Sequence, residues 1–323
     1  MTHTYTEPHQ HTLHTDCVSE RLQPSVDLVR EIAAFVRTTS GKQFRARIAA
    51  SLANSIKTGS VVPSDLIECL ESLHAFTLIH DDIIDKSELR RGQPSLWRRY
   101  TTELALLFGD YQHARVYECL TKTTQIPDRI RVSLIRAFAE ASAKVQEGQI
   151  QELAAAYDTD LSKEAYCTIA TNKTSSLIWL ACFIGGAIAG ADGRQMDQLR
   201  EFAHSFGIAF QIYNDLIDFE SQHGKSPLDD LRSGKVTLPM IFYCQGRRAR
   251  GEELTQAEYR QLALTGKLEG LTREIAGCGA LSKAFTCMNS FIERAESALK
   301  GITTIPSEID IILRKFRSAR PRK

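Results

Sequence analysis

The chain has 323 residues, with 40 Lys and Arg against 39 Asp and Glu, so its formal net charge is only +1. This length can bury a large core, and the balanced charge gives no overall field that would attract nucleic acid, so we expect no nucleic-acid partner. The eight cysteines include no C-x-x-C pair, which favours reduced thiols in a cytoplasmic protein. The longest apolar run, 177–189, is interrupted by two glycines and is too short for an integral membrane segment.

Residues 1–17 are polar and histidine-rich, which predicts a disordered N-terminal tail. Beyond the tail, apolar residues recur at three- and four-residue spacing, with Gly- or Pro-marked breaks between the segments and no strand pattern of useful length. We therefore expect residues 18–323 to form a single all-α domain, a bundle of about ten or more helices around a central cavity. Ser64 and Asp65 are expected to cap one helix. The expected helical segments are 26–36, 66–84, 104–120, 130–153, 165–188 and 199–219.

The first aspartate-rich motif occupies residues 80–85, His-Asp-Asp-Ile-Ile-Asp. Residues four apart lie on one helical face, so Asp81 and Asp85 form a pair of carboxylates one turn apart. Such a pair is unfavourable unless a cation neutralises it. Oxygen ligands favour a hard cation such as Mg²⁺, which proteins usually hold with few carboxylates, waters and substrate phosphates.

A second motif, residues 211–218, places Asn214 one turn from Asp218 in the same way. A single acidic motif on a helix is often only solvated surface. Here both motifs lie inside apolar runs, which a solvated face would not have, and the loop of an EF-hand is missing. The two motifs together predict a phosphorylated substrate bridged to two helices through Mg²⁺.

Basic residues near Gly-marked breaks supply the opposite charge. Lys42 and Arg45 open a helix after Gly41, where free N–H groups and the helix dipole favour an anion. Arginine side chains bind phosphate in bidentate fashion, and Arg90 and Arg91 follow the first motif. Each basic residue alone could be surface charge, and His74, two turns before Asp81, could be a core histidine. Taken together, they provide enough cations for two polyanionic substrates.

Residues 20–320 resemble the trans-isoprenyl diphosphate synthases, also called polyprenyl synthetases. The resemblance implies the isoprenoid synthase fold and a Mg²⁺-dependent prenyltransferase that condenses isopentenyl diphosphate with dimethylallyl, geranyl or farnesyl diphosphate. It also implies a homodimer and about three Mg²⁺ ions per site once substrate is bound. The motifs that carry it, in the family's order, are Gly41-Lys42-x-x-Arg45, residues 78–85 with Arg90-Arg91-Gly92, Gly148-Gln149 with Glu152, Lys173-Thr174, Gln211 with Asp215 and Asp218, and Gly234-Lys235-x-Thr237-Leu238-Pro239.

The resemblance implies roles for individual residues. The metal ligands are Asp81, Asp85, Asn214 and Asp218. Isopentenyl diphosphate is bound by Lys42, Arg45, His74 and Arg91, and the allylic diphosphate by Arg90, Lys173, Lys225 and Lys235. Catalytic roles fall to Asp81, Asp82, Asp85, Lys173, Thr174, Gln211 and Asp215.

Two positions depart from the family pattern, since Gln43 replaces the usual Arg and Asn214 replaces the usual first acid of the second motif. In the family, side chains just before the first motif form the floor of the product tunnel; here these are Phe76, Thr77 and Leu73. We therefore expect a short or medium product, farnesyl or geranylgeranyl diphosphate. We also expect Phe76→Ala to lengthen it.

Two other functions remain open. A class I terpene cyclase would also ionise a prenyl diphosphate, but it would need no second diphosphate site. A catalytically weak partner subunit of a prenyl synthase would fit the loss of an acid at Asn214, although the intact first motif argues against it.

Overall fold

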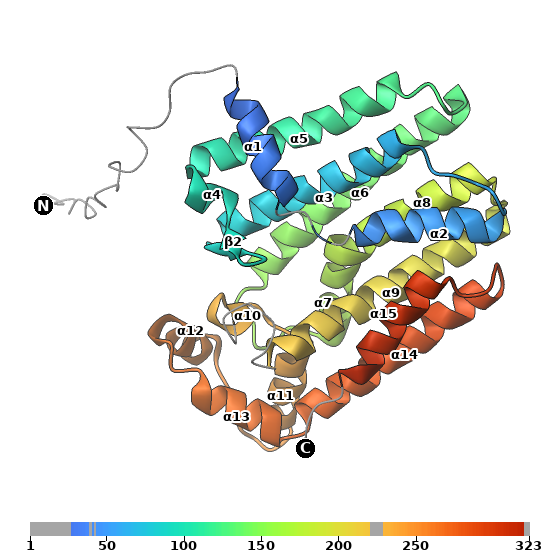
Figure 1. Cartoon of the computed structure of the whole chain (residues 1–323). Coiled ribbons are helices and arrows are strands. Elements are labelled where there is room, and N and C mark those ends of the chain that lie inside the picture. Colours follow the sequence, from blue (N-terminus) through green and yellow to red (C-terminus); the bar gives the residue numbers. More distant parts are fainter. Residues whose placement is uncertain (1–26, 39–40, 42, 220–228, 320–323) are drawn as a thin grey trace, which may run out of the picture.

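The structure is a computed structural model that describes residues 27–38, 41, 43–219 and 229–319. The expected tail, Lys42 and Lys225 lie outside these residues. Regular structure in the described part is almost entirely helical, which confirms the all-α prediction (Figure 1). The elements are α1 (Leu28–Thr38), α2 (Phe44–Ile56), α3 (Ser64–Ile84), β1 (Leu89–Arg90), β2 (Gln93–Pro94), α4 (Leu96–Arg99), α5 (Thr102–Lys122), α6 (Asp128–Ala154), α7 (Lys163–Ala170), the π-helical turn η2 (Thr171–Ser175), α8 (Ser176–Ala189), α9 (Gly193–Asp218), α10 (Asp229–Arg232), α11 (Leu238–Arg248), α12 (Gln256–Thr265), α13 (Glu269–Gly277), α14 (Ala280–Lys300) and α15 (Ser307–Ser318).

The helix ends follow from local sequence. Helix α8 ends at Gly190, which has φ 75°, and the N–H of Ala191 donates to the carbonyl of Gly186 in a Schellman-type closure. Helix α9 then begins with a capping box, in which Asp192 and Gln195 exchange side-chain-to-backbone hydrogen bonds of 2.8 and 3.0 Å.

The capping prediction for α3 is wrong. Pro63 is the N-cap residue, and no side chain caps the helix, so Ser64 and Asp65 already lie in its first turn. Proline suits this entry because its fixed φ and missing N–H cost nothing where the chain turns into a helix.

The expected helix 165–188 is interrupted at η2, where the N–H of Ser176 donates to the carbonyl of Thr171. This i→i−5 bond widens one turn between α7 and α8. Such turns are often found at functional sites.

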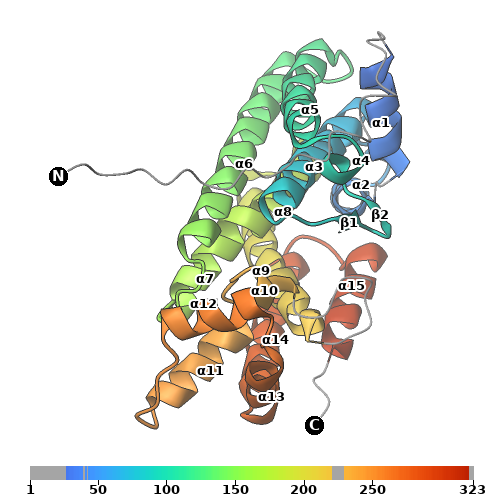
Figure 2. The same ribbon diagram turned by 90° about the vertical axis from the view of Figure 1, so that its left-hand side faces the viewer.

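The main core lies between the long helices, with buried side chains from α2, α3, α6, α8, α9 and α14. A separate cluster, which includes Tyr243 and Tyr259, holds the short helices α10–α13 together, and Figure 2 shows these helices gathered at one end of the long ones. A third cluster joins α1 and α4 to α5 through Ile32, Leu96 and Phe108. The long helices therefore form a rigid frame for the residues they carry.

The seven cysteines in the described part of the chain are free thiols, as expected, and three of them, Cys69, Cys182 and Cys244, are buried. Within the described helices, none is both long and apolar enough to cross a bilayer.

Candidate active site

Both aspartate-rich motifs line one cavity of about 1230 Å³. Its walls come from α2, α3, α6, α7, η2, α8, α9, α10 and α15, together with the β1–β2 hairpin and the segment before α11. The predicted site residues on its wall are Arg45, His74, Thr77, Asp81, Asp85, Arg90, Arg91, Lys173, Thr174, Gln211, Asn214, Asp215, Asp218 and Lys235.

The first motif forms the last turn of α3, and Asp85 caps that helix. Burial raises the pKa of Asp81, and the charges of Asp85 and Glu152 act in the same direction, while Lys173 and Lys235 partly oppose them. The pair of carboxylates therefore carries the electrostatic cost that the sequence predicts in the absence of a bound cation.

Asp82 faces away from this cavity. It is nearly fully buried, and both its oxygens accept hydrogen bonds of 3.1 Å from Nε of Arg90. The β1–β2 hairpin places Arg90 there, because Arg91 (φ 54°) and Gly92 (φ 79°) form its two-residue turn, as in a type I′ hairpin. Arg90 lines the cavity, so Asp82 helps to hold a side chain of its wall. The catalytic role of Asp82 stays a prediction.

Asp215 in the second motif is also tied to the protein. Its Oδ2 accepts hydrogen bonds from the hydroxyl of Tyr166 at 2.7 Å and from the N–H of Leu238 at 2.9 Å, and its Oδ1 accepts from Nε2 of Gln211 at 3.1 Å. Burial raises the pKa of Asp215 to about 7, although these hydrogen bonds oppose the rise. Its carboxylate joins α7, α9 and α11, and Asp215 also lines the cavity. Its catalytic role stays a prediction. Nothing in the sequence motif marked Tyr166.

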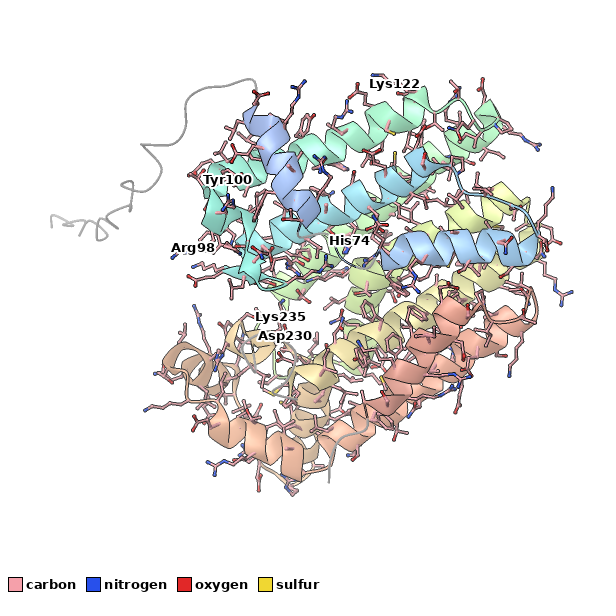
Figure 3. All side chains as sticks on the ribbon, viewed as in Figure 1. His74, Arg98, Tyr100, Lys122, Asp230 and Lys235 are labelled. Carbon is pink, nitrogen blue, oxygen red and sulfur yellow. The ribbon has the colours of Figure 1, made fainter. Side chains whose placement is uncertain are left out.

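Lys235 lies among three acidic side chains. Its Nζ is 2.7 Å from Oδ2 of Asp85, 3.7 Å from Oδ1 of Asp230 and 4.0 Å from Oε2 of Glu152. Figure 3 shows Asp230 and Lys235 next to each other, and His74, which belongs to α3, farther from them. Burial lowers the pKa of Lys235, but the three carboxylates outweigh burial and raise it well above its ordinary value. The sequence analysis missed Asp230, although it lies five residues before Lys235.

The η2 turn presents Lys173 and Thr174 to the cavity. Nζ of Lys173 donates to Oε2 of Glu152 at 2.5 Å. The hydroxyl of Thr174 donates to Oε1 of Gln211 at 2.9 Å. The resemblance had already marked Glu152, and the structure shows that it is the counter-ion of Lys173.

At another part of the cavity wall, Arg45, His74 and Arg91 form a basic group. Burial lowers the pKa of His74 well below its ordinary value, and the charges of Arg45 and Arg91 add to this. Burial likewise lowers the pKa of Arg45 to about 10, against the opposing charge of Glu71. Nε of Arg45 and Nδ1 of His74 are buried without a hydrogen-bond partner, which fits a group that binds an anion.

Gly41 admits one member of this group. A Cβ at this position would lie 2.5 Å from Cζ of Arg91, so a larger residue would make this flexible side chain shift.

The residues predicted to set product length divide between two environments. Thr77 lies on the cavity wall, whereas Phe76 and Leu73 are buried and are not part of it. The ring of Phe76 stacks on His113 of α5, with centroids 4.6 Å apart and planes 14° apart. Phe76 therefore packs on α5 and does not line this cavity.

The residues present fit a hard cation. Among the described residues, no three His, Cys, Asp or Glu side chains already form a metal cluster. Asp81 and Asp85 from α3, with Asn214 and Asp218 from α9, instead provide oxygen donors from two helices on one cavity. This is the donor set that Mg²⁺ uses when waters and substrate phosphates complete its coordination.

Comparison with known proteins identifies the family of the chain. The sequence model of the family "Polyprenyl synthetase" matches residues 26–270, and the chain belongs to that family. The all-trans-nonaprenyl-diphosphate synthase (geranyl-diphosphate specific) of Rhodobacter capsulatus is 31% identical over 90% of this chain and 87% of its own. The geranylgeranyl diphosphate synthase of Mycobacterium tuberculosis is 30% identical over 84% of this chain and 78% of its own.

The fold agrees as well. The crystal structure of a decaprenyl diphosphate synthase from Rhodobacter capsulatus superposes with a TM-score of 0.80 at 27% identity, over 94% of this chain and 93% of that one. The protein is thus a prenyltransferase with the isoprenoid synthase fold, and it has prenyl diphosphate synthase activity.

Proposed function

We propose that the protein condenses isopentenyl diphosphate head-to-tail with an allylic prenyl diphosphate, with Mg²⁺ as cofactor. The observation that carries this proposal is that one cavity holds two separate anion-binding groups. One combines the carboxylates and amide of two helices with Lys173 and Lys235. The other, Arg45, His74 and Arg91, has no acidic metal-binding pair and suits a diphosphate bound by the two guanidinium groups and the imidazole without a metal ion.

In this proposal the allylic diphosphate lies beside Lys173 and Lys235. Asp81, Asp85, Asn214 and Asp218 would hold Mg²⁺, and about three ions per site are proposed from the family resemblance. When bound, Mg²⁺ supplies positive charge that neutralises the departing diphosphate. The two lysines add to this charge, so that the allylic C–O bond breaks and its electron pair leaves with the diphosphate.

The isopentenyl diphosphate would be held by Arg45, His74 and Arg91, with its double bond directed at the allylic carbon. Oxygen dipoles of Thr174 and Gln211 would stabilise the positive carbon. The buried apolar side chains of Val145 and Leu177 on the cavity wall exclude water that would otherwise capture it. Attack by the double bond forms the new C–C bond, and the released diphosphate accepts the proton whose loss completes the product.

The proposed product is farnesyl or geranylgeranyl diphosphate. Support comes from the relative of Mycobacterium tuberculosis, which is named for the geranylgeranyl product, whereas two of the relatives above are named for longer chains. The small Thr77 on the wall favours the longer of the two proposed products.

We also propose that the protein is a homodimer. Helices α5 and α6 leave several large apolar side chains exposed, including Leu107 at 64% and Ile150 at 66%. A second copy of the chain would bury these side chains. Light scattering of the purified protein would measure the oligomeric state.

The experiment that tests the function is an incubation of the purified protein with Mg²⁺, labelled isopentenyl diphosphate and each of dimethylallyl, geranyl and farnesyl diphosphate. We expect incorporation of label into a longer prenyl diphosphate. A cyclic hydrocarbon formed without isopentenyl diphosphate would instead identify a cyclase, and no product with any allylic substrate would identify a weak partner subunit. The basic group around Arg45 argues against the cyclase, because a cyclase binds one diphosphate.

A further inference from the structure

The wide turn η2 is packed against two glycines on neighbouring helices. Gly148 lies in the interior of α6, and a Cβ there would come 2.5 Å from the backbone N and 2.9 Å from Cα of Lys173. Gly207 lies in the interior of α9, and a Cβ there would come 2.5 Å from Cα and 2.7 Å from Cβ of Ser175. These atoms belong to the backbone or are attached directly to it, so no side-chain rotation relieves the contact.

Glycine is otherwise a poor residue for the middle of a helix, since it loses more conformational freedom on folding than alanine. Neither glycine has a positive φ. A special backbone conformation therefore does not explain them, and the close approach of η2 does.

Each glycine is followed one turn later by the residue that holds an active-site side chain. Glu152, four residues after Gly148, accepts the hydrogen bond of Lys173. Gln211, four residues after Gly207, accepts the hydrogen bond of Thr174. Helices α6 and α9 therefore use the same arrangement. In each, a glycine contacts the backbone of η2, and a residue one turn later accepts a hydrogen bond from an η2 side chain.

We propose that Gly148 and Gly207 are positioning residues. They let the π-helical turn pack close enough to α6 and α9 for Lys173 and Thr174 to reach their partners and the substrate. A methyl group at Gly148 would collide with the backbone of Lys173 and displace that side chain, and one at Gly207 would collide with Ser175 and displace the neighbouring Thr174. Displacements of about 1 Å in an active site can cost up to about 10²-fold in rate. The inference rests on the proposed roles of Lys173 and Thr174 in the condensation.

The test compares Gly148→Ala and Gly207→Ala with two control glycines. Gly185→Ala places a Cβ 2.6 Å from the carbonyl oxygen of Ala49, away from the cavity, and Gly270→Ala meets nothing within 4 Å. We expect kcat to fall at least about 10-fold in both test variants, with the KM for isopentenyl diphosphate changed less than about 3-fold, because the basic group around Arg45 is untouched. In each control variant, kcat calculated per folded molecule should equal that of the wild type.

A double-mutant cycle separates positioning from general damage. In a Lys173→Ala background, Gly148→Ala should lower kcat by less than a further factor of about 3, because the side chain that it displaces is already absent. Thr174→Val provides the same background for Gly207→Ala.

The proposal would be overturned if the glycine substitutions lowered kcat by the same factor in the presence and absence of these side chains. Normal kcat in the single variants would overturn it as well. Failure of both variants to fold would overturn it too, since the glycines would then serve the fold. An inactive wild-type protein would contradict the proposed function instead, so the two failures can be told apart.

Discussion

Nζ of Lys235 donates a hydrogen bond of 2.7 Å to Oδ2 of Asp85, across 150 positions of the sequence. The ammonium group lies beside the first aspartate-rich motif and within 4.0 Å of Glu152. It supplies the positive charge that the carboxylates need when no metal ion is bound. A divalent ion that binds Asp85 must therefore compete with Lys235.

The first prediction concerns this competition. In Lys235→Met, Asp85, Glu152 and Asp230 lose their shared counter-ion, so we expect a lower melting temperature without metal and a larger rise on adding Mg²⁺ than in the wild type. A tenfold gain in metal affinity corresponds to about 1.4 kcal/mol, or about 2 °C in a chain of this size. Lys144→Met, at an exposed ion pair on α6, is the matched control. An Mg²⁺-induced shift equal to that of the wild type would contradict the competition.

The second prediction concerns the first motif. Asp81→Asn removes one charged oxygen ligand, and we expect turnover to fall on the order of 10²-fold or more. Glu68→Gln changes an exposed acid on the same helix and should leave turnover unchanged. Incorporation of labelled isopentenyl diphosphate measures both, and near-normal turnover of Asp81→Asn in EDTA would disprove the assignment of Asp81 as a metal ligand.

The third prediction concerns Asn214. Its amide oxygen can ligate Mg²⁺ but carries no charge, so the attraction for an ion at the second motif is weaker than with aspartate. Asn214→Asp should therefore lower the half-saturating Mg²⁺ concentration without changing the product. Magnesium titrations of the two enzymes side by side measure this. If the Asp variant is slower even at saturating Mg²⁺, the amide has another role, such as donating to a diphosphate oxygen.

The fourth prediction concerns product length. Thr77 lies on the cavity wall, so Thr77→Phe should fill the space and shorten the main product by at least one isoprene unit. Phe76 stacks on His113 instead, so Phe76→Ala should affect stability more than product length, in contrast to the expectation from the sequence alone. Chromatography of the dephosphorylated products compares the variants. A longer product from Phe76→Ala, with no change from Thr77→Phe, would place the floor at Phe76 after all.

The fifth prediction concerns pH. The folded-state pKa of His74 is well below its ordinary value of 6.5, so below that pH the unfolded chain binds a proton that the folded chain does not. Stability attributable to this residue is present above pH 6.5 and falls as the pH drops, by at most about 1.4 kcal/mol per pH unit.

This dependence should be absent in His74→Gln. Urea unfolding of the diphosphate-free protein at several pH values between 7.5 and 5.5 compares the two proteins. Parallel pH profiles of wild type and variant would show that His74 does not contribute.

Much of the helical frame could be predicted because its signals are local. The three- and four-residue spacing of apolar side chains located α3 and α6 to within two residues at each end. The spacing Asp81 to Asp85 predicted a shared face from helix geometry alone, and the motif order indicated the family.

The sequence could not predict contacts that depend on how helices approach one another. The pattern marked Asp82 and Asp215 as equals of their neighbours, but each is tied to a side chain that the motifs do not pair with it, Asp82 to Arg90 and Asp215 to Tyr166. The η2 turn was read as ordinary helix, because a wider turn has no clear signature in one sequence.

By itself, then, the sequence determined the all-helical class and the family, and it predicted the residues of the site, since periodicity and charge are properties of neighbours along a chain. Only the tertiary structure decided which of those residues line the cavity, that Lys235 balances Asp85, and that Phe76 packs on His113 instead of lining the cavity. The reason is that side-chain direction and counter-ion choice depend on packing between segments far apart in sequence, and packing is settled only when the helices meet.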